Sequence, residues 1–510
     1  MTDTRRDHRT RREDDDQSWD KPVRPVSRLP GEIGARSGRG TPAQAARRNA
    51  REEWRQSQLA GIQALLELDG PVIANLHHTV PLFIDTKEKG RGSLLKDPAI
   101  RGALALMFSA GATGVLSYVF WAVTAHRMDA AAVGKISAEV SAITFLATVG
   151  SLNLTGIFGR FLPVAGWHAR RLVATGYGSA AVAGLVVALI YLTTPLSKGS
   201  LIGGSAGTVT FVACVVLNSI FNIQDGGLIG FGRFGWIPVE NTTVALVRFG
   251  FLPVMAIFLS SQASVLGAWL VPMALAVIVV NIFNLGPLPG RKMRERPKLP
   301  RTGSLLHMIA VNAVSSSVTA VVSSFLPAFV AHRLGAAQGG YFYVPWMITT
   351  MVALLMMNVT TSMVREVVAN PKRAGSAIRR SIGMAALVVV GVMVLCLLLA
   401  NLILTPLGPA FVTHGAPLMR WVGLTMPATA VIIFFWANCS IYRRPWPSFG
   451  LSLFTAIAVF GGILLLPSGS GIASVGMVYC VVQWVAALVA IFPTFNGLRA
   501  IARREKSRRQ

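Results

Sequence analysis

Residues 381–404 read SIGMAALVVVGVMVLCLLLANLIL, a run of 24 residues without one charged side chain. About 20 mostly apolar residues in a helix are enough to cross the ~30 Å hydrocarbon layer of a membrane. Arg379 and Arg380 directly precede the run, and such a basic flank is typical of a helix end on the cytoplasmic side. The sequence therefore predicts a membrane-spanning helix here.

The same pattern recurs along the chain of 510 residues, which is 53% hydrophobic and only 14% charged, with a mean hydropathy of +0.54. A soluble protein carries about 25% charged residues. The predicted spans are 102–125, 133–156, 172–194, 207–228, 236–259, 264–286, 305–330, 341–364, 381–404, 416–440, 447–467 and 471–493. We therefore predict an all-α polytopic membrane protein with about twelve transmembrane helices.

Loops with many basic residues alternate along the chain with loops that have few. The rich loops and the C-terminal tail carry Arg160, Arg170, Arg171, Arg233, Arg291, Lys292, Arg294, Arg296, Lys298, Lys372, Arg373, Arg379, Arg380, Arg443, Arg444, Arg503, Arg504, Lys506, Arg508 and Arg509. The poor loops carry Arg127, Lys135, Lys198 and Arg333. Since basic loops face the cytoplasm, both termini are expected there, in a multi-pass protein of the cell (plasma) membrane.

The composition argues against several classes of protein. Beyond residue 100 the chain has 30 Lys and Arg but only 7 Asp and Glu. A nucleic-acid-binding protein collects such charge on a soluble basic face, whereas here it lies in short clusters between apolar runs. Four isolated cysteines and the lack of a nucleotide or hydrolase motif predict no metal site, cofactor or enzymatic activity.

The two halves of the chain repeat. Ala125-His126-Arg127-Met128 after the first span matches Ala331-His332-Arg333-Leu334 after the seventh, and Asn153 matches Asn358 near the ends of the following spans. Six spans per half predict two parallel six-helix lobes. The expected parts are a partly disordered cytoplasmic tail at 1–100 with an amphipathic helix at 42–69, an N-lobe at 101–286, a basic linker at 287–304, a C-lobe at 305–493 and a basic tail at 494–510.

The Ala-His-Arg turn, Gly134 and Gly340 near the start of the next span, and the exit Phe161-Leu162-Pro163 resemble one known family. It comprises the polysaccharide flippases of the multidrug/oligosaccharidyl-lipid/polysaccharide exporter superfamily. The resemblance covers roughly residues 98–495 and is one of pattern and topology. It implies two V-shaped lobes that move a lipid-linked sugar across the membrane by alternating access.

Ionisable residues inside spans cost about 2.5–3.5 kcal/mol each, so they usually face a partner or a wet cavity. Arg248 is halfway along its span, with Glu139, Lys135 and Arg420 nearer to span ends. We expect Arg248, with Lys135 and Arg420, to make the cavity cationic for a lipid pyrophosphate, because guanidinium groups suit phosphate oxygens. Glu139 either orients one of these basic groups or takes up a proton or cation that drives the cycle. In the structural alternative, Glu139 pairs permanently with Arg248, while Lys135 and Arg420 extend to the outer headgroups. The i, i+4 spacing also lets Glu139 pair with Lys135.

Asn312, Asn438 and the neighbouring Trp436 complete the candidate substrate-binding set, because amides and rings bind sugars by hydrogen bonding and stacking. The commoner role of such amides is to bond one helix to another. The predicted partners are a lipid-linked glycan, membrane lipids and, through the N-terminal region, glycan-synthesis enzymes. No nucleic acid is expected.

The sequence thus favours a flippase for a lipid-linked oligosaccharide or polysaccharide precursor, moving it from the inner to the outer leaflet. A multidrug exporter of the same superfamily would favour acidic and aromatic residues for cationic drugs. A glycosyltransferase or polymerase would need a polar loop with acidic or His residues. A non-transporting scaffold, suggested by the long N-terminal extension, is a further alternative.

Overall fold

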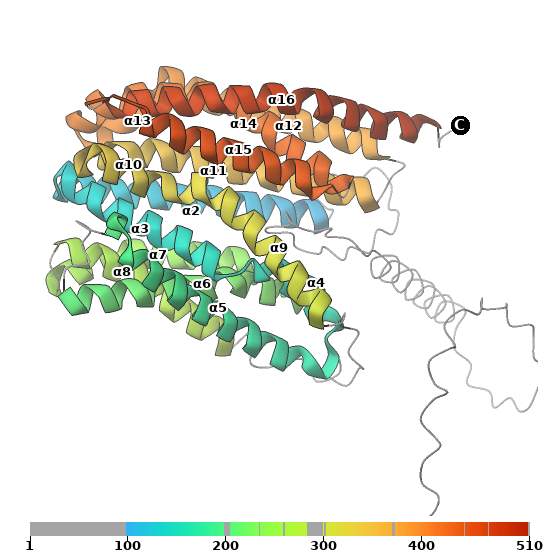
Figure 1. The fold of residues 1–510 in the computed structure, drawn as a ribbon, viewed down its shortest axis with the longest axis horizontal. Coiled ribbons are helices and arrows are strands. Elements are labelled where there is room, and N and C mark those ends of the chain that lie inside the picture. The colour runs from blue at the N-terminus through green and yellow to red at the C-terminus, as the bar shows by residue number, and fades with distance from the viewer. Residues whose placement is uncertain are drawn as a thin grey trace, which may run out of the picture. The chain divides into compact units, whose positions relative to one another are not determined.

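The computed structural model describes residues 98–197, 204–233, 235–258, 261–282, 299, 302–369, 373–442, 444–467 and 469–507 (Figure 1). Throughout these ranges the regular elements are helices, and no strand occurs. The predicted amphipathic helix at 42–69 and most of the linker at 287–304 lie outside the described residues.

The first half contains helices α2 (Pro98–Arg127), α3 (Ala130–Gly150), α4 (Leu154–Phe161), α5 (Ala169–Thr193), α6 (Gly204–Gly230), α7 (Trp236–Phe258) and α8 (Ser261–Val280). The second contains α9 (Thr302–Ala320), a π-helical turn (Val321–Phe325), α10 (Leu326–Leu334), α11 (Ala336–Ala369), α12 (Ala374–Leu398), α13 (Ala400–Leu404), α14 (Pro409–Ile441), α15 (Pro445–Leu464) and α16 (Ile472–Ser507). Each predicted span falls mainly on one or more of these helices, so the all-α membrane fold is confirmed.

Nine of the helical segments in the described ranges are long and apolar enough to cross a membrane. The other three predicted spans correspond to α2, α7 and α8. We call the helix ends that carry Arg160, Arg233, Arg380 and Arg444 the basic end, and the other ends the opposite end.

Two spans differ from the prediction in their limits. The predicted span 133–156 is interrupted, because α3 ends at Gly150 and Leu152 and Asn153 adopt left-handed φ values of 49° and 52° before α4 begins. The predicted span 471–493 continues instead into the expected tail, since α16 runs without a break to Ser507. Arg503 near its C-terminus favours this extension, because basic groups complement the helix dipole there.

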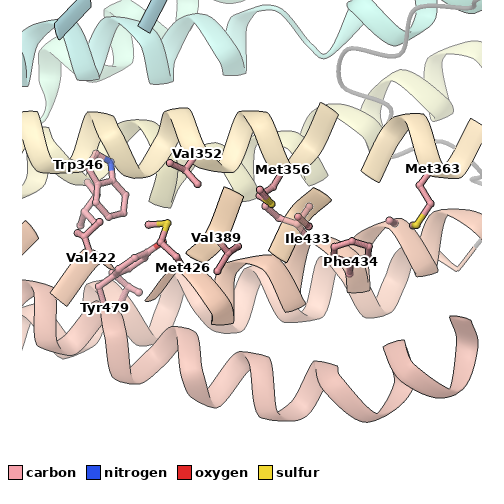
Figure 2. Packing of buried hydrophobic residues seen from close by; sticks show 14 of the residues in the cluster. Trp346, Val352, Met356, Met363, Val389, Val422, Met426, Ile433, Phe434 and Tyr479 are labelled. Carbon is pink, nitrogen blue, oxygen red and sulfur yellow. The ribbon is translucent and has the colours of Figure 1, made fainter. Parts of the chain in front are cut away.

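The core of the second half is apolar, and four long helices contribute most of it. Figure 2 shows side chains such as Trp346, Met356, Val389 and Met426 from α11, α12 and α14, together with Tyr479 of α16, packed in one cluster. Most of these side chains are almost fully buried. Close packing of this kind holds helices together in lipid, where burial of apolar surface alone gives no advantage.

The two halves meet at the opposite end. Gly134 of α3 packs against α11 so closely that a Cβ there would lie 2.8 Å from the backbone nitrogen of Gly340. The Tyr118 hydroxyl of the first half donates to the Ile403 carbonyl of the second. An apolar cluster with side chains from both halves surrounds this contact and includes Phe120, Trp121, Leu252, Val265, Val344, Leu404, Phe411 and Met419.

Helix α9 belongs to the second half in sequence but also packs on the first. Leu305, Met308 and Ile309 lie against the apolar cluster formed by α4 and its neighbours, and Figure 1 shows α9 running toward α4. A π-helical turn follows α9, and Trp346 Nε1 donates to the Ser323 carbonyl in this turn at 2.9 Å. The seventh predicted span therefore connects the cores of the two halves.

Candidate functional site

Arg248 lies near the middle of α7, in a small pocket between three helices of the first half. Its guanidinium carbon is 4.2 Å from the centre of the Trp269 ring on α8. Cation–π stacking of this kind stabilises a charged group away from water by roughly 2 kcal/mol when both groups are desolvated. The other lining residues are Leu116, Ser117, Phe120, Trp121 and Ala245.

No carboxylate neutralises Arg248 among the described residues, where the one ion pair joins Arg380 to Glu366. The Arg248 Nε is buried and has no hydrogen-bond partner within the same part of the chain. A buried guanidinium with an unused donor is suited to bind an anion. Without one, nothing compensates for the free energy that it costs to remove this charge from water.

Glu139 forms neither of the ion pairs considered as alternatives among the described residues. Glu139 is only 5% exposed, and its Oε2 has no hydrogen-bond partner in the described chain. It lies near Tyr191 of α5 and Cys214 of α6, inside the first half. Lys135 is exposed, so the i, i+4 spacing of the two residues does not bring their charged groups together. The alternative of a permanent bond to Arg248 is excluded as well.

One aromatic residue of the second half lies close to Arg248. Tyr343 of α11 packs against Trp121, with ring centres 4.6 Å apart, and lies close enough to Arg248 to interact with its charge. Arg248 therefore lies where α2, α7 and α8 approach α11. A group between the two halves is placed to respond when they move relative to each other.

The remaining predicted site residues do not line this pocket. Arg420 is exposed on α14, as Lys135 is on α3. Asn438 donates to the Pro493 carbonyl of α16 at 3.3 Å, which is the helix-bonding role considered above. Trp436 of α14 is half-buried, and Asn312 of α9 is 6% exposed. Their part in substrate binding stays a prediction.

A second polar cluster was missed in the sequence. It lies at the basic end of the first half, where Gln224 and Asp225 near the end of α6 meet Glu240 and Asn241 near the start of α7. Charges close to span ends usually reach the headgroup layer, so these two acids gave little signal. The rarity of acidic residues could have drawn attention to them, because the chain has only 7 acidic residues beyond residue 100.

Groups of three or more His, Cys, Asp or Glu arranged to hold a metal ion do not occur in the described residues. The four cysteines are all buried and unpaired. No protein-family model and no curated protein matches the sequence.

Solved structures of MATE transporters match the fold. The inward-facing conformation of a multidrug resistance MATE family transporter of the MOP superfamily has a TM-score of 0.56 and 14% identity, covering 79% of this chain and 99% of that one. The outward-facing conformation of a multidrug resistance MATE family transporter of the MOP superfamily has a TM-score of 0.52 and 14% identity, covering 82% of this chain and 100% of that one. MATE in complex with MaL6 has a TM-score of 0.56 and 15% identity, covering 79% and 96%.

At this identity the similarity defines a fold and not an activity. The chain is a multi-pass membrane protein with the MATE-like fold of MOP-superfamily transporters.

Proposed function

We propose that this protein is a transporter that moves a lipid-linked oligosaccharide or polysaccharide precursor, joined to its lipid through a pyrophosphate, to the outer leaflet. The observation that carries the proposal is Arg248, a buried guanidinium with no carboxylate partner among the described residues. The MATE-like fold supports transport in general. Enzymatic activity forms no part of the proposal.

The chemistry of the Arg248 pocket favours an anionic cargo. A guanidinium binds two phosphate oxygens through parallel hydrogen bonds, which an ammonium cannot do. The Trp269 ring holds one face of the guanidinium and leaves its edge for hydrogen bonding. A cargo with a pyrophosphate needs such a group, because its charge cannot enter hydrocarbon without compensation.

A multidrug exporter is the second candidate, because the similar solved structures include multidrug resistance transporters. A cationic drug would be repelled by Arg248, yet it would be attracted to Glu139, which is buried in the first half without a basic partner in the described chain. The two candidates therefore predict different phenotypes for substitutions of Arg248 and Glu139.

The test compares Arg248→Ala with the wild type in cells that lack the chromosomal gene. Lipid-linked glycans are extracted and quantified by mass spectrometry, and those in the outer leaflet are identified by enzymatic labelling of intact cells. We expect deletion to trap the precursor inside, the wild-type gene to restore export, and Arg248→Ala to reduce it at least tenfold at equal protein level. Arg248→Lys keeps the charge without the planar donor group and is expected to restore export only in part.

Arg420→Ala is the matched control, since this arginine is exposed and does not line the pocket. It should export normally. Full export by Arg248→Ala would remove Arg248 from the mechanism. If the deletion instead left glycans unchanged and made the cells sensitive to cationic compounds, the multidrug candidate would replace the flippase.

A further inference from the structure

One face of α11 contacts the first half near the opposite end. Gly340, Val344 and Met351 share this face, because they are separated by four and seven residues, about one and two helical turns. A Cβ on Gly340 would collide with the Ala130 carbonyl oxygen of α3, and Met351 fills the space beside Gly114 of α2. Val344 belongs to the apolar cluster that has side chains from both halves. Residues that continue this face toward the basic end are directed at the first half as well.

The same face becomes polar toward the basic end. Asn358, Ser362 and Arg365 continue it at helical spacing, and we call these three residues the polar row. The Ser362 side chain is exposed, and those of Asn358 and Arg365 are half-buried. Met356 and Met363 lie on the other side of α11, in the apolar core of the second half that Figure 2 shows. The polar row therefore faces away from the core of its own half.

The polar row lies within the part of α11 that is long and apolar enough to span a membrane, Ala336–Val368. At 1.5 Å per residue, Arg365 is about 5 Å and Asn358 about 15 Å from the basic end of that segment. Hydrocarbon offers no hydrogen bonds to such groups, so polar side chains at this depth usually face protein or a wet cavity. Since the polar row is exposed or only half-buried, it needs water or a polar ligand beside it.

The matching surface of the first half is covered. The sequence repeat pairs Asn358 with Asn153 and Arg365 with Arg160. Asn153 is only 5% exposed, and Arg160 Nη1 lies 3.9 Å from Met308 Sδ of α9. Helix α9 therefore occupies the position next to Arg160, whereas the polar row is partly exposed. Of these two matching surfaces, the polar row is the one that is open to a ligand.

The chemistry of the polar row matches a phosphorylated sugar. Arg365 forms no ion pair in the described part of the chain, and the neighbouring Glu366 pairs with Arg380 of α12. A guanidinium binds two phosphate oxygens through parallel hydrogen bonds. The hydroxyl of Ser362 and the amide of Asn358 can both donate and accept, so they suit sugar hydroxyls. A sugar joined to a lipid through a pyrophosphate presents both kinds of group in one molecule.

The polar row and the Arg248 pocket are too far apart to bind one pyrophosphate together. Tyr343, which lies close to Arg248, is 22 residues before Arg365 on α11. That separation corresponds to about 33 Å along the helix, roughly the thickness of the hydrocarbon layer. A cargo that uses both sites must therefore bind them one after the other.

We propose that the polar row is an entry site, which binds the pyrophosphate and first sugars of a lipid-linked cargo at the basic end before they reach Arg248. This inference rests on the proposed function and adds a second binding site, on the other half. Arg365 binds the pyrophosphate, because it lies about one turn inside the span, next to the headgroup layer of the inner leaflet. Ser362 and Asn358 lie deeper and bind the sugars that extend between the halves.

The experiment measures binding of ³H-labelled farnesyl pyrophosphate, a short lipid pyrophosphate, to the purified full-length protein in detergent. Arg248→Ala removes the other site, so the remaining binding belongs to the polar row. We expect this variant to retain saturable binding, for which inorganic pyrophosphate competes only weakly and farnesol does not compete. Adding Arg365→Ala should weaken the binding at least tenfold, because charge-assisted hydrogen bonds are lost. Adding Arg379→Ala instead should change it less than twofold, since that arginine is exposed on α12.

Export in cells separates this inference from the proposed function. In the deletion strain, Arg365→Ala and the double variant Asn358→Ala/Ser362→Ala should each reduce glycan export at least fivefold at equal protein level. If Arg365→Ala does not fold, Arg365→Gln replaces it in both assays.

Four results would overturn the entry site and leave the role of Arg248 in export untouched. They are loss of all probe binding in Arg248→Ala, equal binding by Arg248→Ala with and without Arg365→Ala, competition by inorganic pyrophosphate as strong as by the farnesyl compound, and normal export by Arg365→Ala. A deletion strain that traps no lipid-linked glycan would instead overturn the proposed function, and this inference with it.

Discussion

The second span of each half begins alike and ends differently. Both spans follow an Ala-His-Arg loop, and their glycines Gly134 and Gly340 pack against the partner helix. The first then stops at Gly150 and resumes as α4 after two left-handed residues, whereas α11 continues through the matching Asn358 to Ala369. The shared sequence pattern predicts where each helix starts, but local packing decides whether it continues.

A close contact with α5 accompanies the interruption at Gly150. A Cβ at this position would lie 2.7 Å from the Cα of Gly184 on α5, so the backbones of α3 and α5 nearly touch there. The matching part of α11 carries Leu355 and Met356, whose long side chains keep neighbouring helices apart. Glu139 also has no counterpart in the second half, where Val344 or Pro345 occupies the matching position of α11.

The largest effect is expected where the two spans touch. Gly134→Leu places a side chain against the backbone of α11, and overpacking against backbone that cannot move should destabilise the protein by about 3 kcal/mol or more. Thermal unfolding in detergent and the yield of monodisperse protein measure the loss. Gly391→Leu on α12 has open space around the glycine and should change little. Equal stability of the two variants would disprove the close contact between the spans.

A smaller effect is expected at the interruption. Asn tolerates the left-handed conformation, whereas a β-branched residue does not, so Asn153→Val should destabilise by about 1–2 kcal/mol. Asn153→Gly should be neutral. Asn358→Val, in the uninterrupted helix, should change stability by less than about 0.5 kcal/mol. The same unfolding assay measures all three, and equal losses for the two valine variants would mean that the spans have the same backbone after all.

The smallest effect is expected for an ion pair of the second half that has no counterpart in the first half. Glu366 of α11 pairs with Arg380 of α12, while Phe161 is the matching residue in the first half. The Arg380 side chain is 55% exposed, and exposed ion pairs contribute about 0–1 kcal/mol. Arg380→Ala should therefore lower the unfolding temperature only slightly, and less still at high salt. A loss of several degrees that persists in 1 M salt would require a packing role for this side chain.

Much of the fold could be predicted from the sequence because membrane spans are long and nearly free of charge. The run 381–404 corresponds to α12 and α13. The interruption at Leu152 and Asn153 could not be predicted, because neither residue is a glycine or proline. The π-helical turn at Val321–Phe325 also lacks a local signal, since one of its carbonyls is satisfied by Trp346 from another helix.

The candidate site was predictable only in part. The depth of Arg248 follows from counting residues along its span, but its contact with Trp269 depends on how α7 and α8 are rotated. The i, i+4 spacing of Lys135 and Glu139 permits an ion pair, but the Lys135 side chain is exposed and the Glu139 side chain is buried. Asp225 and Glu240 are 15 positions apart in sequence, and only the turn between α6 and α7 brings them together.

The position of α9 has a consequence for synthesis of the chain. Leu305, Met308 and Ile309 cover the apolar cluster around α4, although they follow the whole first half in the order of translation. The first six spans therefore leave the ribosome with part of their interior uncovered, and only the seventh completes it. Two separately expressed halves divided near residue 290 would expose this surface on the first fragment, so a single continuous chain is the safer route to assembly in the membrane.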